Sequence, residues 1–126
     1  MKKTVLLSGF LFAALLAQAQ TSVIVLQRAG TSNFYYMPTT TFVDVLNLAM
    51  ENDTIYLPGG TIPYTGATID KKLTIVGAGF HQNGVPVTQK TVLPTTTFGG
   101  FGIGSGASGS SFHGIDFECT MYFAVA

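Results

Sequence analysis

The chain has 126 residues, of which six are basic, six are acidic and one is a cysteine. A chain of this length forms one small domain, and a single cysteine leaves no internal disulfide to stabilise it. Charged residues make up only 10% of the sequence. It therefore has no basic surface of the kind that binds nucleic acid or anionic lipid, and we expect neither as a partner.

The N-terminal segment, residues 1–19, has the three parts of a cleavable secretory signal peptide. Lys2 and Lys3 precede an apolar run over residues 4–16, which is too short to span a bilayer, and an Ala-x-Ala site ends at Ala19. We predict cleavage after Ala19, a secreted, cell-surface or periplasmic location, and no membrane span after cleavage. The mature chain, residues 20–126, carries four basic and six acidic side chains, a net charge of −2.

Residues 20–40 are expected to form an N-terminal strand and a connection. Ser22 to Gln27 is a β-branched run of strand length, and Arg28 to Pro38 has the mixed composition of a connection. Within it, the aromatic cluster Phe34 to Tyr36 fits either a platform that stacks on sugars or packing over an edge of the core. We favour packing.

A helical pattern covers Thr41 to Glu51. Thr40 or Thr41 can cap this helix, and Asp44 lies in the first turn, where the helix dipole favours a carboxylate. Asn52 and Asp53 end it. One face carries the apolar residues at helical spacing, Phe42, Val45, Leu46, Ala49 and Met50. We expect that face to pack on an apolar surface.

From Thr54 onward the pattern changes to short strands without intervening helices. The apolar pieces are Thr54–Leu57, Ala67–Val76, Thr91–Phe98, Phe101–Ile103, Phe112–Cys119 and Met121–Val125. Leu57, Ile75 and Leu93 recur at a constant interval of eighteen positions, and Ile115 follows after a slightly longer one. Such a recurrence suggests the coils of a solenoid, in which each turn buries its inward row by stacking on the next.

Two segments, Thr41 to Thr61 and Leu73 to Gly79, carry a resemblance to a known family. They resemble the opening of right-handed parallel β-helix proteins of the pectin-lyase-like class, in which an amphipathic helix caps the first coil and Asp-Thr-Ile and Leu-Thr-Ile-x-Gly-x-Gly strands follow. The resemblance implies an all-β fold over residues 41–126, a right-handed parallel β-helix with a short N-terminal capping α-helix. Catalytic residues of the family's enzymes lie on later coils, so none is carried over to this chain.

The sequence stops at Ala126, just after an apolar strand. A solenoid without a polar cap exposes its last coil and an open row of backbone hydrogen-bonding groups. We therefore expect a truncated solenoid, the N-terminal part of a longer protein, and self-association through the uncapped C-terminal coil. The alternative is a self-contained small β-domain whose last strand is covered by another part of the chain.

Asp116 and Glu118 are the candidate binding residues. They lie two apart on a predicted strand, so both would face outward while Ile115, Phe117 and Cys119 face inward. Paired carboxylates suit Ca²⁺ binding or acid–base work on a glycosidic bond, but we favour a solvated strand face because no further acidic residue completes a site. Cys119 is either a reactive thiol or a small core residue, and we favour the core. We predict no catalytic residue, metal or cofactor.

These features predict an exported β-helix scaffold or binding module that contacts polysaccharide or another cell-surface component. The alternative is the non-catalytic N-terminal part of a secreted polysaccharide lyase or glycoside hydrolase. Sequence beyond Ala126 would distinguish the two, because an enzyme would carry clustered Asp with Arg or Lys on one outward face of later coils.

Overall fold

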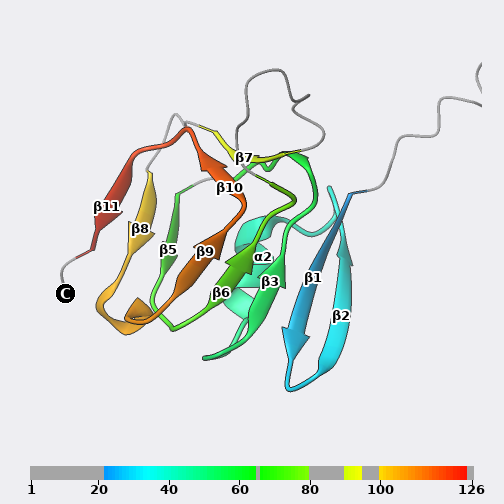
Figure 1. Cartoon of the computed structure of the whole chain (residues 1–126), viewed down its shortest axis with the longest axis horizontal. Coiled ribbons are helices and arrows are strands. Elements are labelled where there is room, and N and C mark those ends of the chain that lie inside the picture. The colour runs from blue at the N-terminus through cyan, green and yellow to red at the C-terminus, as the bar shows by residue number, and fades with distance from the viewer. Residues whose placement is uncertain (1–21, 65, 80–89, 95–99, 125–126) are drawn as a thin grey trace, which may run out of the picture.

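The computed structural model describes residues 22–64, 66–79, 90–94 and 100–124, and the predicted signal peptide lies outside them (Figure 1). The described part is dominated by β-strands, with one α-helix. Its α-helix is α2 (Phe42–Leu48), its 3₁₀ turn is η2 (Ser105–Ala107), and its strands are β1 (Val23–Arg28), β2 (Thr31–Tyr36), β3 (Thr54–Tyr56), β4 (Gly60–Thr61), β5 (Ala67–Ile69), β6 (Thr74–Val76), β7 (Thr91–Leu93), β8 (Phe101–Ile103), β9 (Ser111–His113), β10 (Ile115–Phe117) and β11 (Met121–Phe123).

The N-terminal strand is confirmed, but the connection predicted after it is wrong. Residues 31–36 form β2, which pairs antiparallel with β1. The two strands are joined by Ala29 and Gly30, with φ of 47° and 83°. Positive φ at both positions is the geometry of a two-residue turn whose twist matches that of the flanking strands. The chain therefore reverses at this turn, and residues 31–36, which have the mixed composition of a connection, pair with β1 as a strand.

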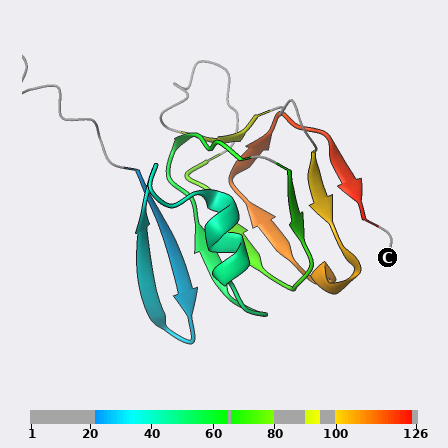
Figure 2. The ribbon, with the colours of Figure 1, turned by 180° about the vertical axis from the view of Figure 1, so that it is seen from behind.

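Helix α2 begins where the sequence predicts it and ends earlier. Thr41 is the N-cap, and it exchanges hydrogen bonds with Asp44 in a capping box. Phe42, Val45 and Leu46 are buried. The helix ends at Leu48 because the chain becomes extended at Ala49. The predicted extension to Glu51, with Met50 on the apolar face, is therefore wrong, and Met50 is exposed. Figure 2 shows α2 between the β1–β2 hairpin and β5.

Nine short strands form three parallel ladders. The chain passes through the ladders three times in the same order, so that β3, β4 and β5 form a first triplet, β6, β7 and β8 a second, and β9, β10 and β11 a third. Within each ladder the strands pair in parallel in triplet order. The β1–β2 hairpin extends the first ladder beyond β3, which makes a five-stranded sheet.

The constant interval predicted between coils is wrong. Ile55 pairs with Ile75, twenty positions on, and Ile75 pairs with Phe112, thirty-seven positions on. The intervals differ because the connections between strands differ in length. Two predicted runs are also divided. Ala67–Val76 contains both β5 and β6, and Phe112–Cys119 contains the last two residues of β9 and all of β10, with a corner at Gly114, whose φ is +62°.

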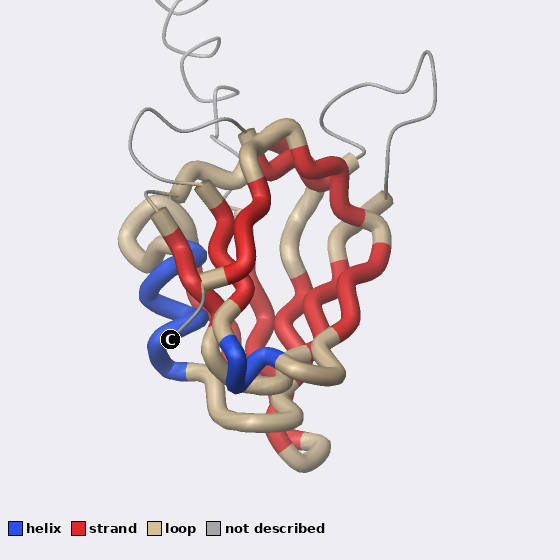
Figure 3. The backbone as a smooth tube through the Cα atoms, turned by 90° about the vertical axis from the view of Figure 1, so that its left-hand side faces the viewer, coloured by secondary structure: helices blue, strands red, loops and turns tan. Residues whose placement is uncertain are grey.

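The core lies between the ladders, and Phe101 is at its centre. Its ring stacks on Phe42 of α2 at 6.4 Å and meets Tyr64, Phe112 and Phe117 at 5.7–6.1 Å between centroids. These rings come from the helix, from the connection between β4 and β5, and from the second and third triplets. Seen from the β11 side, the strands surround this interior rather than forming one flat layer (Figure 3). Aromatic packing therefore links the helix to the last triplet.

Candidate functional site

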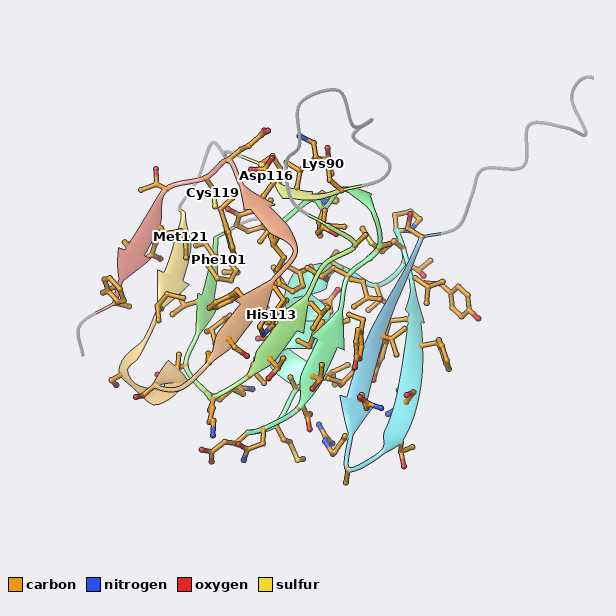
Figure 4. All side chains as sticks on the ribbon, viewed as in Figure 1. Lys90, Phe101, His113, Asp116, Cys119 and Met121 are labelled. Atoms are coloured by element: carbon orange, nitrogen blue, oxygen red, sulfur yellow. The ribbon has the colours of Figure 1, made fainter. Side chains whose placement is uncertain are left out.

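The structure places the two predicted carboxylates differently. Asp116 lies in β10, and its Oδ2 is 3.3 Å from the Nζ of Lys90, whose side chain is only 6% exposed (Figure 4). A buried ammonium needs such a partner, so Asp116 has a structural role. Glu118 is exposed and lies one residue beyond the end of β10 at Phe117, where its N–H still donates to the carbonyl of Leu93 on β7 at 2.9 Å. Their binding of a ligand stays a prediction.

Cys119 is half-buried and packs against the core, as do Ile115 and Phe117. The inward orientation that the alternation predicted for these three residues is confirmed. Tyr64 lies beside Cys119. Burial, together with the neighbouring thiol, raises the pKa of Tyr64. Its hydroxyl makes no hydrogen bond to any residue that the structure describes.

Asp53 is the most enclosed acidic residue of the described ranges, at 3% exposed. Arg28 donates to both of its carboxylate oxygens, from Nε at 3.1 and 3.0 Å and from Nη2 at 2.8 Å. The backbone N–H of Met50 adds a bond of 2.8 Å. Burial alone would raise the pKa of Asp53, but the hydrogen bonds from Arg28 and Met50 outweigh it and lower that pKa. Arg28 also donates to the carbonyl of Leu48 at 2.9 Å, so this pair fixes the end of α2.

Two further carboxylates serve the backbone. Asp44 accepts hydrogen bonds from the hydroxyl and the N–H of Thr41, at 2.7 and 2.8 Å, and these bonds lower the pKa of Asp44. Asp70 accepts from the N–H of Gly106 at 3.0 Å. Together with Asp53 and Asp116, four of the six acidic residues therefore hold the fold together.

The outward side of the five-stranded sheet is the candidate binding surface. We call it the outer face. It consists of the residues that alternate with the inward ones on β1, β2, β3, β6 and β9, namely Val23, Val25, Gln27, Ser32, Phe34, Tyr36, Thr54, Tyr56, Thr74, Val76, Ser111 and His113. None of these twelve positions is Asp, Glu, Lys or Arg. The surface is therefore built from apolar, aromatic and uncharged polar side chains together with His113.

The strand register orders the outer face into two rows that cross the sheet. An aromatic and apolar row runs through Phe34, Val25, Tyr56, Val76 and His113. Beside it, a polar row runs through Ser32, Gln27, Thr54, Thr74 and Ser111. Two hydrogen bonds order these side chains, from Tyr56 to Gln27 at 3.2 Å and from Ser111 to Thr74 at 3.3 Å.

The aromatic cluster of β2 divides between the two sides of the sheet. Phe34 and Tyr36 are 60% and 57% exposed on the outer face, whereas Tyr35 packs against the core. Packing, the role favoured from the sequence, therefore holds for Tyr35 and is wrong for its two neighbours. The signal that could have found this is the period of two in Ser32, Phe34 and Tyr36, which is typical of one side of a strand.

A hollow at the start of α2 is a weaker candidate. Its volume is about 170 Å³, and it is lined by Thr41, Val43, Pro63 and Tyr64. Small-molecule sites typically measure about 300 to 1,000 Å³. The hollow is thus too small to hold a ligand of that kind, and the outer face remains the stronger candidate.

Within the described ranges, no cluster of three or more His, Cys, Asp or Glu residues is placed to hold a metal ion. The same ranges contain no helix with the length and apolarity needed to cross a membrane. No family model matches the chain, and neither the curated proteins nor the solved structures compared with it give a match.

Proposed function

We propose that this chain is an exported scaffold and binding module that opens a right-handed parallel β-helix and contacts glycan at a cell surface. The observation that carries the proposal is the repeated passage through three parallel ladders in the same order. Crossover connections between parallel strands of one sheet are right-handed in nearly all proteins, which supports the proposed hand. In a β-helix, outward side chains from successive coils line up in rows, as they do on the outer face.

The use of the carboxylates supports a binding module over a catalytic unit. Asp44 caps α2, Asp53 pairs with Arg28, Asp70 holds the N–H of Gly106, and Asp116 pairs with Lys90. Each of these groups is engaged by a neighbour within the fold. Glycosidic cleavage by the usual route needs two carboxyl groups placed on either side of a sugar linkage.

A retention assay tests this function. The purified chain is mixed with insoluble polysaccharides and with cell-envelope material, and both the retained protein and the released sugars are measured. We expect retention without release of reducing ends or unsaturated sugars. Release that Asp116→Asn or Glu118→Gln abolishes would favour the polysaccharide lyase or hydrolase instead.

Export is tested separately. Expression from Met1 should yield a chain that starts at Gln20, outside the cytoplasm. Mass spectrometry of the exported protein measures this start. A chain that stays in the cytoplasm and still begins at Met1 would contradict the proposal.

A further inference from the structure

We propose that the outer face binds a neutral, extended β-linked glycan that lies across the strands, with Phe34 and Tyr56 stacking on sugar rings. This inference rests on the proposed function, because it names the ligand class and the residues for the same glycan contact. The argument uses the charge of the face, the exposure of its rings and the register of its strands.

The charges of the chain favour a neutral ligand. The outer face carries no Asp, Glu, Lys or Arg. An acidic glycan needs basic side chains as partners. The chain has four basic residues after residue 19, and three of them have partners within the fold. Arg28 pairs with Asp53, Lys90 pairs with Asp116, and Lys71 donates to the carbonyls of Leu46 and Ala49 at 3.4 and 2.7 Å. The fourth, Lys72, lies between β5 and β6, where its side chain passes beside Gly109.

Exposed rings supply the stacking surface. Phe34 and Tyr56 are 60% and 41% exposed, which leaves large apolar areas in water. The hydroxyl of Tyr56 donates to Gln27 on the neighbouring strand, one row away. This bond holds the Tyr56 side chain along the sheet. The ring thus offers a broad surface to a ligand.

The register sets the direction of the ligand. Phe34 and Tyr56 are separated by β1, two strand spacings or roughly 9 to 10 Å. An extended β-linked glycan turns alternate rings the same way, so two such rings can stack on the two aromatic side chains. The polar row runs parallel to this line, and its Gln, Thr and Ser groups can donate and accept hydrogen bonds to sugar hydroxyls. The row ends at Ser111 on β9, so all three triplets contribute to the surface.

Titration calorimetry tests the proposal on the full chain, expressed from Met1. The neutral probes are cello-, xylo- and manno-oligosaccharides, and the acidic probe is an oligogalacturonate of equal length. We expect binding to at least one neutral probe, weaker binding to the acidic one, and a Kd that does not change with salt because no charge is engaged. Phe34→Ala and Tyr56→Ala should each raise the Kd about ten-fold.

Matched variants separate binding from folding. Tyr56→Phe keeps the ring and should keep most of the affinity, and Leu48→Ala removes an exposed apolar side chain outside the outer face and should leave the Kd unchanged. Neutral-glycan binding that survives both Phe34→Ala and Tyr56→Ala would overturn this inference and leave the proposed function standing. Tighter binding to oligogalacturonate would also overturn it. An absence of binding to every glycan tested would overturn the inference and the proposed function together.

Discussion

The three triplets stack along the ladders, and the first and the last triplet form the two ends of this stack. Both ends have apolar side chains at the inward positions of the third ladder, but the exposed fractions of these side chains differ greatly. In the third ladder, Ala67 and Ile69 of the first triplet are each 2% exposed. Their partners two strands away in the last triplet, Met121 and Phe123, are 45% and 83% exposed. The row through Ile69 passes through Ile103, which is half-buried. Exposure therefore rises from one end of the stack to the other.

The difference comes from what lies beyond each end. At the first triplet, α2 places Phe42, Val45 and Leu46 against the core, and the β1–β2 hairpin continues the first ladder. At the other end, β9, β10 and β11 are the outermost strands of their ladders in the described part of the chain. An inward side chain in a stack of strands is buried by its neighbours along the stack. The alternation of apolar and polar residues along one strand decides which side chains point inward. It does not bury them, because burial needs a neighbouring triplet or a covering helix.

Removing the cover of the first end should have the largest effect. Leu46→Asp places a charge in the buried face of α2, and we expect it to lower the free energy of unfolding by about 4 kcal/mol. Asn47→Asp, on the exposed side of the same helix, should cost less than about 1 kcal/mol. Denaturant unfolding of both variants measures the difference. Equal losses would mean that α2 does not cover the core.

The ion pair at the end of α2 should come next. Arg28→Ala leaves the enclosed carboxylate of Asp53 with its Met50 hydrogen bond and without its guanidinium, and should lower the free energy of unfolding by less than Leu46→Asp does, because the guanidinium is 39% exposed and screened by water. Arg28→Lys keeps the charge and loses the two-pronged geometry, so its cost should be intermediate. The same unfolding experiment checks both. Equal losses for Ala and Lys would show that the guanidinium geometry matters and the charge alone does not, and no loss in either variant would show that the pair contributes little.

Acid should weaken the same end of the stack. Because the folded state lowers the pKa of Asp53, the unfolded chain binds this proton more readily. The stabilisation is therefore complete above the ordinary Asp pKa of about 3.9 and is lost as the pH falls through the lower folded pKa. Asp53→Asn should be less stable at neutral pH and should lose less stability on acidification. Unfolding curves between neutral pH and about pH 2 test this, and parallel pH profiles for the two proteins would contradict it.

The exposed end should drive self-association. Burying a large apolar side chain contributes roughly 1.5 to 3 kcal/mol, and Met121, Tyr122 and Phe123 are all exposed on β11. Phe123→Asp should weaken association about ten-fold, which is about 1.4 kcal/mol. Leu48→Asp, which alters an exposed leucine on α2, is the control and should leave association unchanged. Sedimentation at several concentrations measures the effect, and a wild-type chain that is monomeric at every concentration would contradict the prediction.

The smallest effect should come from the cap of the covering helix. Thr41→Ala removes the hydroxyl that accepts from the N–H of Asp44 and donates to its carboxylate, and should cost about 1 kcal/mol. Thr41→Ser keeps the oxygen and should stay near the wild type. Thermal unfolding of the two variants measures the difference. If Ser is as damaging as Ala, the methyl group of Thr41 matters more than its hydroxyl.

Local signals were sufficient for the elements whose structure depends on near neighbours in the chain. Thr41 and Asp44 have the spacing of a helix cap, and the apolar residues that follow have helical spacing. The β-branched run from Val23 is recognisable for the same reason. The end of α2 was not predictable in this way, because Arg28 and Asp53 fix it from outside the helix.

By itself, the sequence determined the start of α2 and the inward side of the segment from Ile115 to Cys119, because capping and alternation act over a few residues. Only the tertiary structure decided which strands are neighbours. The interval between partners in one ladder is much shorter from Ile55 to Ile75 than from Ile75 to Phe112, because the connections between strands vary in length. The outer face depends on this register, since Phe34, Tyr56 and His113 enter one row only when five strands align. Register is set by packing across strands, and no local pattern in the sequence records it.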